Sequence, residues 1–166
     1  MEKKRSQLTK EQAYTRLAGL CARGERTSFD MRRKLLLWGF SAAECEAVVN
    51  KLREQGFIDE YRYARAFVHD KHEFDRWGKL KIVAHLRAKQ IPEDAIAQAL
   101  EMIDTSGDVE TLVSLMRKRA GTLKSKEPRL ARASLMRFAA ARGYSMDQAM
   151  AALERIGSNY MDADLD

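Results

Sequence analysis

The stretch GFSAAECEAVVNKL, at residues 39–52, decides the fold because its pattern occurs three times. It returns as QIPEDAIAQALEMI at residues 90–103 and as GYSMDQAMAALERI at residues 143–156, so the turns recur after 51 and 53 residues. Apolar residues follow each turn at one, six, ten and thirteen positions, which is the spacing of a buried helix stripe. At the last three offsets stand Cys45, Ile96 and Ala149, then Val49, Leu100 and Leu153, then Leu52, Ile103 and Ile156. The sequence therefore predicts an internal repeat with a helix after each turn.

The starts of these helices carry matching signals. Ser41 with Glu44 and Ser145 with Gln148 are typical of capping boxes, in which each side chain bonds the other residue's backbone N–H. Pro92 suits a first helical turn.

A second helical pattern precedes each turn, and the third copy carries one extra residue there. Its apolar markers are Met31 and Leu35, then Ile82 and Leu86, then Leu130, Leu135 and Phe138.

A further helix is expected before each pair, around residues 13–22, 61–72 and 109–120. Thr9 with Gln12, then Asp59, then Asp108 are the predicted caps. Each module of about 50 residues is then three helices, too small to bury much surface alone, so the copies should stack.

We therefore expect an all-α protein of three tandem three-helix (helix-turn-helix-like) modules that form an elongated, curved array. The expected parts are a basic N-terminal arm at 1–8, modules at 9–56, 57–105 and 106–156, and an acidic disordered tail at 157–166.

Positive charge is concentrated in two segments. The chain carries a net charge of +6, with nine basic residues and one acid between Arg117 and Arg142. Eight basic residues stand against three acids between Arg62 and Lys89. Like charge at this density favours an anionic or acidic partner.

The cysteines and the lack of long apolar segments limit the class of protein. Cys21 and Cys45 are the only cysteines and are predicted to be small core residues rather than a disulfide. The chain shows neither an apolar run of about 20 residues nor a secretory signal, so we expect a cytoplasmic protein without a membrane partner. We also expect it to be a monomer.

Four stretches resemble the RecX regulatory family. The strongest is GFIDEYRYARAFV at residues 56–68, which is similar to the opening of the family's second module. Gly78-Lys79-Leu80-Lys81-Ile82, with Leu86 and Lys89, resembles the glycine-basic-isoleucine segment that follows. SFDMRRKL at residues 28–35 fits the first module, and residues 142–145 match the third loosely. The segment Phe74-Asp75-Arg76-Trp77 departs from the family's glycine and basic run.

The resemblance implies a specific role. RecX-like proteins are tandem three-helix modules that lodge in the helical groove of the RecA filament on single-stranded DNA. They modulate, and usually inhibit, its ATPase, strand-exchange and co-protease activities, in recombination, DNA repair and the SOS response. Several also bind DNA directly.

Sequence-specific reading of DNA is disfavoured. The helices after the turns begin with acids, such as Glu44, Glu93 and Asp147, which would face phosphates in a major groove. Contacts to the backbone, which ignore base sequence, remain open for single-stranded DNA and, as a second option, double-stranded DNA.

The predicted filament-binding and DNA-binding residues are basic side chains of the second and third modules with one tryptophan. They are Arg65, Lys71, Arg76, Trp77, Lys79, Lys81, Arg87, Lys89, Arg129, Arg132 and Arg142.

Two other functions stay open. One is a sequence-independent single-stranded-DNA-binding helical module without RecA specificity, and the other is a helical scaffold.

An enzyme is disfavoured, because the sequence has neither a phosphate-binding glycine loop nor a nucleophile elbow. His69 and His72 lack a nearby cysteine, so solvated or helix-end histidines are expected rather than a metal site. We expect no cofactor. Of the nearby acids, Asp59 is expected to be a cap, while Asp70, Glu73 and Asp75 should pair with Lys71, Arg76 and Lys79.

Overall fold

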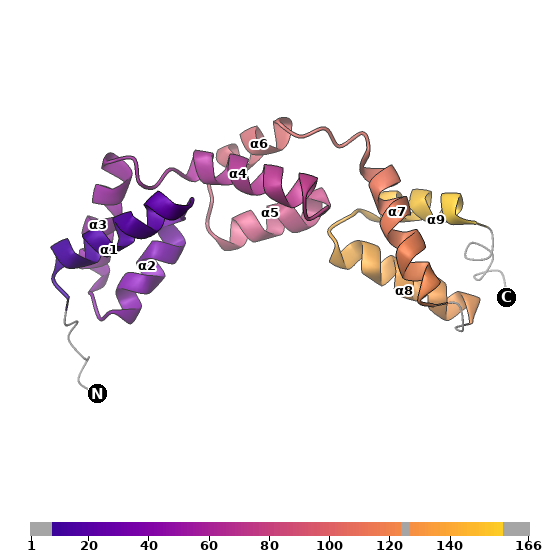
Figure 1. The fold of residues 1–166 in the computed structure, drawn as a ribbon, viewed down its shortest axis with the longest axis horizontal. Coiled ribbons are helices and arrows are strands. Elements are labelled where there is room, and N and C mark those ends of the chain that lie inside the picture. The colour runs from indigo at the N-terminus through magenta and orange to yellow at the C-terminus, as the bar shows by residue number, and fades with distance from the viewer. Residues whose placement is uncertain (1–7, 124–126, 158–166) are drawn as a thin grey trace. The chain divides into compact units, whose positions relative to one another are not determined.

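The computed structural model describes residues 8–123 and 127–157, and within them the regular elements are all helices (Figure 1). They are α1 (Lys10–Arg23), α2 (Ser28–Leu37), α3 (Ala42–Glu54), α4 (Glu60–Glu73), α5 (Lys79–Ala88), α6 (Glu93–Glu101), α7 (Asp108–Gly121), α8 (Pro128–Ala141) and α9 (Met146–Ile156). In the described parts of the chain, every helix is too short or too polar to cross a membrane.

These helices confirm the expected all-α arrangement of three-helix modules. The module boundaries and the curved array stay predictions. The basic arm, apart from Leu8, and the acidic tail beyond Gly157 lie outside the described residues.

The helix N-caps predicted at threonine and serine residues are confirmed. Thr9, Ser41 and Ser145 each form a capping box with the residue three positions on. Asp59 also acts as predicted, because its carboxylate accepts a hydrogen bond from the Arg62 backbone N–H at 3.0 Å. Local spacing was sufficient to find these caps because both partners lie within one turn.

The prediction of Asp108 as a cap is wrong. The N-cap of α7 is Gly107, which makes no side-chain cap bond, and Asp108 is the first helical residue. Its carboxylate instead bonds the imidazole of His72 at 2.7 Å. A partner 36 residues away competes successfully with the local cap, because burial of Asp108 requires a strong hydrogen bond. Pro92 lies directly before α6, where its carbonyl accepts from the Ile96 N–H at 3.1 Å.

The described helices belong to two compact units, whose boundaries fall within α4, α5 and α6. The first unit comprises residues 1–67 and 86–99. Its α1, α2 and α3 enclose one apolar core, to which Phe40 of the first turn contributes. The largest fully buried side chains there are Leu17, Met31, Leu35 and Leu52. Both cysteines are free thiols, of which Cys45 is buried as predicted and Cys21 is half-buried.

The second unit comprises residues 68–85 and 100–166. Its helices α7, α8 and α9 pack around a core that includes Tyr144 of the third turn. The fully buried large side chains of this core are Leu112, Met116, Leu135 and Leu153.

The predicted extra residue before the third turn does not exist, and Leu130 is 57% exposed. The buried residues of α8 at this register are Leu135 and Ala139, which stand eight and four positions before Gly143. Met31 and Leu35 hold the same two positions before Gly39. The third copy is therefore in register with the first. The sequence pattern does not show this register because the residue equivalent to Leu35 is the small Ala139. After the turns, Leu100, Ile103 and Ile156 are only half-buried.

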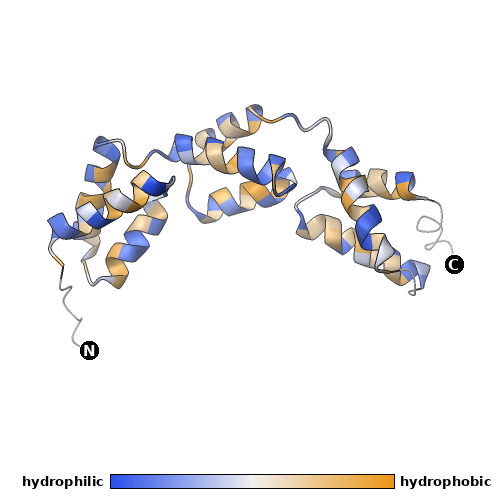
Figure 2. Ribbon diagram, in the orientation of Figure 1, coloured by the Kyte–Doolittle hydropathy of each residue, from blue (hydrophilic) through white to orange (hydrophobic). Residues whose placement is uncertain are grey.

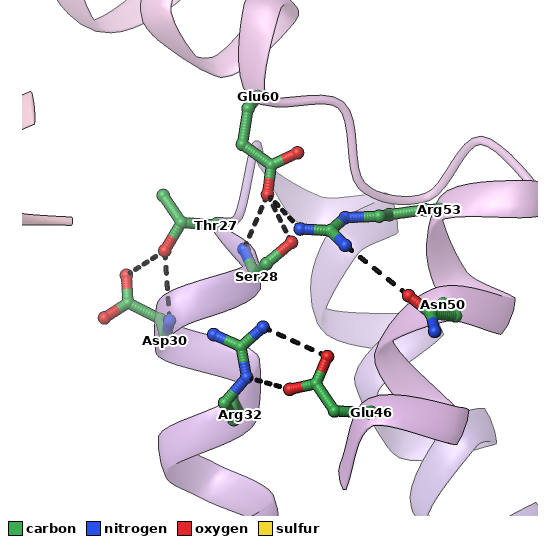
Figure 3. Close-up of polar contacts among 8 residues, drawn as sticks. All are labelled: Thr27, Ser28, Asp30, Arg32, Glu46, Asn50, Arg53 and Glu60. Carbon is green, nitrogen blue, oxygen red and sulfur yellow. Dashed lines mark hydrogen bonds and ion pairs between the residues drawn. The ribbon is translucent and has the colours of Figure 1, made fainter. Parts of the chain in front are cut away.

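In the first unit, Glu60 joins the start of α4 to α2 and α3 (Figure 3). Its carboxylate accepts hydrogen bonds from the Ser28 backbone N–H at 3.3 Å and from the Ser28 hydroxyl. Arg53 of α3 pairs with the same carboxylate at 3.3 Å. A carboxylate at the N-terminus of α2 is favourable because the helix dipole is positive there.

In the second unit, the turn before α9 contacts the start of α5 through bare backbone. The Gly78 N–H donates to the Arg142 carbonyl at 2.8 Å, and the Leu80 N–H donates to the Gly143 carbonyl at 3.0 Å. A Cβ on Gly78 would lie 2.3 Å from the Gly143 carbonyl carbon, and one on Gly143 would lie 2.3 Å from the Lys81 Cβ. Gly143 also has a φ of +90°, which side chains rarely adopt. Both positions therefore require glycine.

Side chains of the same turn reinforce this contact. The Tyr144 hydroxyl donates to the Arg76 carbonyl at 2.8 Å, and the Arg142 guanidinium donates to the same carbonyl at 3.2 Å and to that of Asp75. Burial raises the pKa of Tyr144 to about 12, so its hydroxyl stays a donor throughout the neutral range.

We predict that Gly78→Ala lowers the free energy of unfolding by about 1–3 kcal/mol, because the methyl group must displace backbone atoms of the third turn. Thermal unfolding of the full chain measures the change. The matched control is Gly19→Ala in α1, where a Cβ meets open space. The control should be neutral or stabilising by up to about 1 kcal/mol. Equal unfolding temperatures for Gly78→Ala and the wild type would refute the close contact.

Candidate functional site

Two of the predicted contact residues, Lys71 and Lys81, lie beside a third, Trp77, in the segment between α4 and α5. The Lys81 Nζ lies 4.0 Å from the centroid of the indole ring, and the Lys71 Nζ lies 4.8 Å from it. The ring of His85 is 4.8 Å away and tilted by 56°. Attraction between each ammonium and the aromatic face contributes about 0.5–1 kcal/mol at such half-exposed positions. We call Lys71, Trp77, Lys81 and His85 the Trp77 cluster.

The backbone beside this cluster is fixed by the third module. Arg76 has a φ of +54°, an uncommon conformation for a residue with a side chain. Its carbonyl is the acceptor for Tyr144 and Arg142, as described above, and these bonds hold the strained turn in place. Lys71 pairs with Asp75 at 2.6 Å, as the helical spacing predicts.

Lys79 is the exposed first residue of α5, and Lys81 stands two positions later. The first turn of α5 contains no acid. Cations at this end oppose the helix dipole, so the stability of α5 does not explain them. Binding of an anionic group of a partner molecule would explain them.

Two further predicted residues already pair with acids of their own unit. Arg87 forms two hydrogen bonds with Glu93, at 2.7 and 3.1 Å, and these raise the pKa of Arg87 above its ordinary value. Lys89 pairs with Asp30 of α2 at 2.7 Å. Lys89 stands directly before the second turn, as Arg142 stands before the third, and each reaches the preceding module. Arg65, in the same unit, is exposed on α4.

The predicted residues of the third module lie at different places on α8. Arg129 is exposed in the first turn, whereas Arg142 caps the other end. Thirteen residues of helix separate them by about 20 Å. Arg132 is half-buried, and its guanidinium lies 3.6 Å from the Met150 sulfur of α9. The structure therefore brings Arg142 to the Trp77 segment and leaves Arg129 at the far end of α8.

His72 has a structural role that no local sequence pattern predicts. Its side chain is only 11% exposed, and its ring bonds Asp108 of α7 at 2.7 Å and Glu73 at 2.9 Å. Burial opposes protonation, but the two carboxylates outweigh it and raise the pKa of His72 above its ordinary 6.5. His69, by contrast, is solvated as predicted. Among the described residues, no three histidines, cysteines or acids group as metal ligands would.

We predict that His72 makes stability depend on pH. Because its folded pKa is raised, the imidazolium contributes stability that is complete below pH 6.5 and is lost as the pH rises through the folded pKa. The gap in unfolding temperature between the wild type and His72→Gln should therefore be largest in mild acid and shrink toward alkaline pH. The control is His69→Gln on the same helix, where the imidazole is 63% exposed, and it should change the unfolding temperature in mild acid less than His72→Gln does. A gap that stays constant with pH would contradict the charged pair.

Three family models match the chain in series. The first, second and third three-helix domains of RecX match residues 13–52, 59–100 and 107–153. A regulatory protein RecX of Leptothrix cholodnii is 33% identical over 123 residues, covering 74% of this chain and 75% of the relative. One of Vibrio parahaemolyticus is 31% identical over 135 residues, covering 81% and 84%.

Solved structures agree with this match. A crystal structure of a regulatory protein RecX superposes with a TM-score of 0.78 at 25% identity, covering 87% of this chain and 73% of that one. The structure of RecX from Lactobacillus salivarius shares the fold, with a TM-score of 0.72 at 20% identity, covering 89% and 96%. The three matched domains and the sequence relatives show that this chain belongs to the RecX family of regulatory proteins.

Proposed function

We propose that this protein binds the RecA–single-stranded-DNA filament in the cytoplasm and inhibits its ATPase, recombinase and co-protease activities. It would thereby regulate recombination, DNA repair and the SOS response. Membership of the RecX family supports a regulatory role, and the family's tandem modules give it a repeating surface suited to a repeating partner.

The observation that carries this proposal is the basic start of α5 beside the Trp77 cluster. Lys79 and Lys81 stand in a helical turn without an acid, and the third turn holds the adjacent backbone rigidly. Cations placed on a rigid frame lose little entropy when they bind, so they suit phosphates or carboxylates at fixed positions on a filament. Arg87 and Lys89, which pair with Glu93 and Asp30, would contribute less unless those pairs exchange.

The chemistry of such a contact is electrostatic and independent of base sequence. Charge speeds encounter and makes binding sensitive to salt, whereas the spacing of modules selects the helical partner. The protein would act as a monomer and without a cofactor.

The test is DNA-dependent ATP hydrolysis by RecA on single-stranded DNA, with this protein added below the RecA concentration. We expect inhibition at substoichiometric levels. The variant Lys79→Glu/Lys81→Glu should need a roughly tenfold higher concentration, since both changes repel an anionic partner. The acids themselves favour the N-terminus of α5, so the loss would not come from an unfolded helix.

The matched control is Lys10→Glu/Arg16→Glu, which makes the same change in net charge on exposed positions of α1. It should inhibit as the wild type does. Inhibition that begins only when the DNA itself is saturated would contradict the proposal and would favour a plain single-stranded-DNA-binding module.

A further inference from the structure

The second helices of the first two modules, α2 and α5, begin in a similar way. The first turn of a helix has backbone N–H groups without an acceptor in the helix itself. In α2 the Ser28 N–H donates to the Glu60 carboxylate at 3.3 Å, and in α5 the Leu80 N–H donates to the Gly143 carbonyl at 3.0 Å. Each acceptor belongs to the following module. The hydrogen bonds of these amides therefore report whether neighbouring modules are in contact.

The junction of the first and second modules is held by half-exposed charged side chains. Three ion pairs cross it, namely Glu60 with Arg53, Lys89 with Asp30, and Arg62 with Glu25, at 3.3, 2.7 and 2.5 Å (Figure 3 shows the first). Figure 2 shows that the start of α4 is hydrophilic. The six side chains are between 15% and 43% exposed, so dissolved salt can screen all three pairs.

The junction of the second and third modules is held by backbone contact and by a nearly buried pair. The Gly78 and Leu80 N–H groups donate to carbonyl groups of the third turn, which carry no net charge. The charged pair at this junction is His72 with Asp108, whose side chains are only 11% and 5% exposed. Salt screens buried pairs much less than exposed ones. Rising salt should therefore weaken the first junction far more than the second.

We propose that the three ion pairs around Glu60 form a latch, which opens as ionic strength rises and lets α1, α2 and α3 separate from the start of α4. The second and third modules stay joined. The inference goes beyond the proposed function, because it concerns a change of conformation within the protein. Opening also separates Lys89 from Asp30, so that Lys89 becomes available to an anionic group of a partner. The latch thereby regulates how many basic side chains the protein presents.

The experiment follows hydrogen exchange of single backbone amides by NMR in the full chain. The two conditions are about 0.1 and 1 M sodium chloride, between which the Debye length falls from about 10 to 3 Å. We expect the Ser28 amide to exchange roughly tenfold faster at the higher salt, because exposed pairs are weak and easily screened. The Gly78 and Leu80 amides should change less than about twofold. The Asp30 amide donates to the Thr27 hydroxyl at 3.0 Å within the same turn, so it reports the effect of salt on exchange itself.

The test variant is Glu60→Gln, which removes the charge of the latch and keeps an oxygen that can accept from Ser28. In this variant the Ser28 amide should exchange at the lower salt about as fast as the wild type does at the higher salt. The matched control is Glu54→Gln, which removes the same charge from an exposed position at the end of α3 and should behave like the wild type. Slow exchange at Gly78 and Leu80 shows in each variant that the second junction is intact.

A Ser28 amide whose exchange does not respond to salt would overturn the latch. Equal acceleration of the Ser28, Gly78 and Leu80 amides would also overturn it, because salt would then loosen the whole protein. A Glu60→Gln variant that exchanges as Glu54→Gln does would exclude Glu60 as the centre of the latch. Because the sample contains neither RecA nor DNA, the result is independent of the ATPase test of the proposed function.

Discussion

The close contact between Gly78 and Gly143 is the constraint on which the arrangement of the second unit depends. Backbone meets backbone there, with hydrogen bonds of 2.8 and 3.0 Å and no room for a side chain on either residue. The contact fixes where α5 begins relative to the third turn. It therefore also fixes Lys79 and Lys81, whose positions carry the proposed function. Tyr144 and Arg142 close the same junction on the Arg76 carbonyl. The core of α7, α8 and α9 therefore also holds any site on this segment in a fixed position.

The basic residues of the protein differ in whether they already bond to other groups of the protein. Arg142 and Lys89 stand at equivalent positions before two turns, and both are used to join a module to the one before it. Repeat proteins need such contacts, because each module alone buries too little surface to be stable. Basic residues are therefore not equivalent evidence for an anionic partner. The informative ones are those that oppose a helix dipole or stand without acids, such as Lys79 and Arg129.

Features that depend on neighbours in sequence could be predicted. The capping boxes at Ser41 and Ser145, and the stripe from Met31 to Leu35, follow from spacings within one or two turns. Phe138 suggested an extra residue before the third turn, because the buried residue at the position equivalent to Leu35 is the neighbouring Ala139. The bond between His72 and Asp108 spans 36 residues, and no local pattern marks it. Gly78 and Gly143 each belong to a motif of the sequence. Their contact could not be predicted, since spacing along the chain does not show which turn meets which helix.

In the proposed function, the protein binds the assembled filament rather than RecA or single-stranded DNA alone. Sedimentation tests this with RecA filaments assembled on single-stranded DNA with a slowly hydrolysed nucleotide, beside naked DNA and free RecA. We expect the protein to sediment with the filament at a salt concentration that releases it from naked DNA, and we expect free RecA not to retain it. Equal retention by naked DNA and by the filament would show that the filament is not the specific partner.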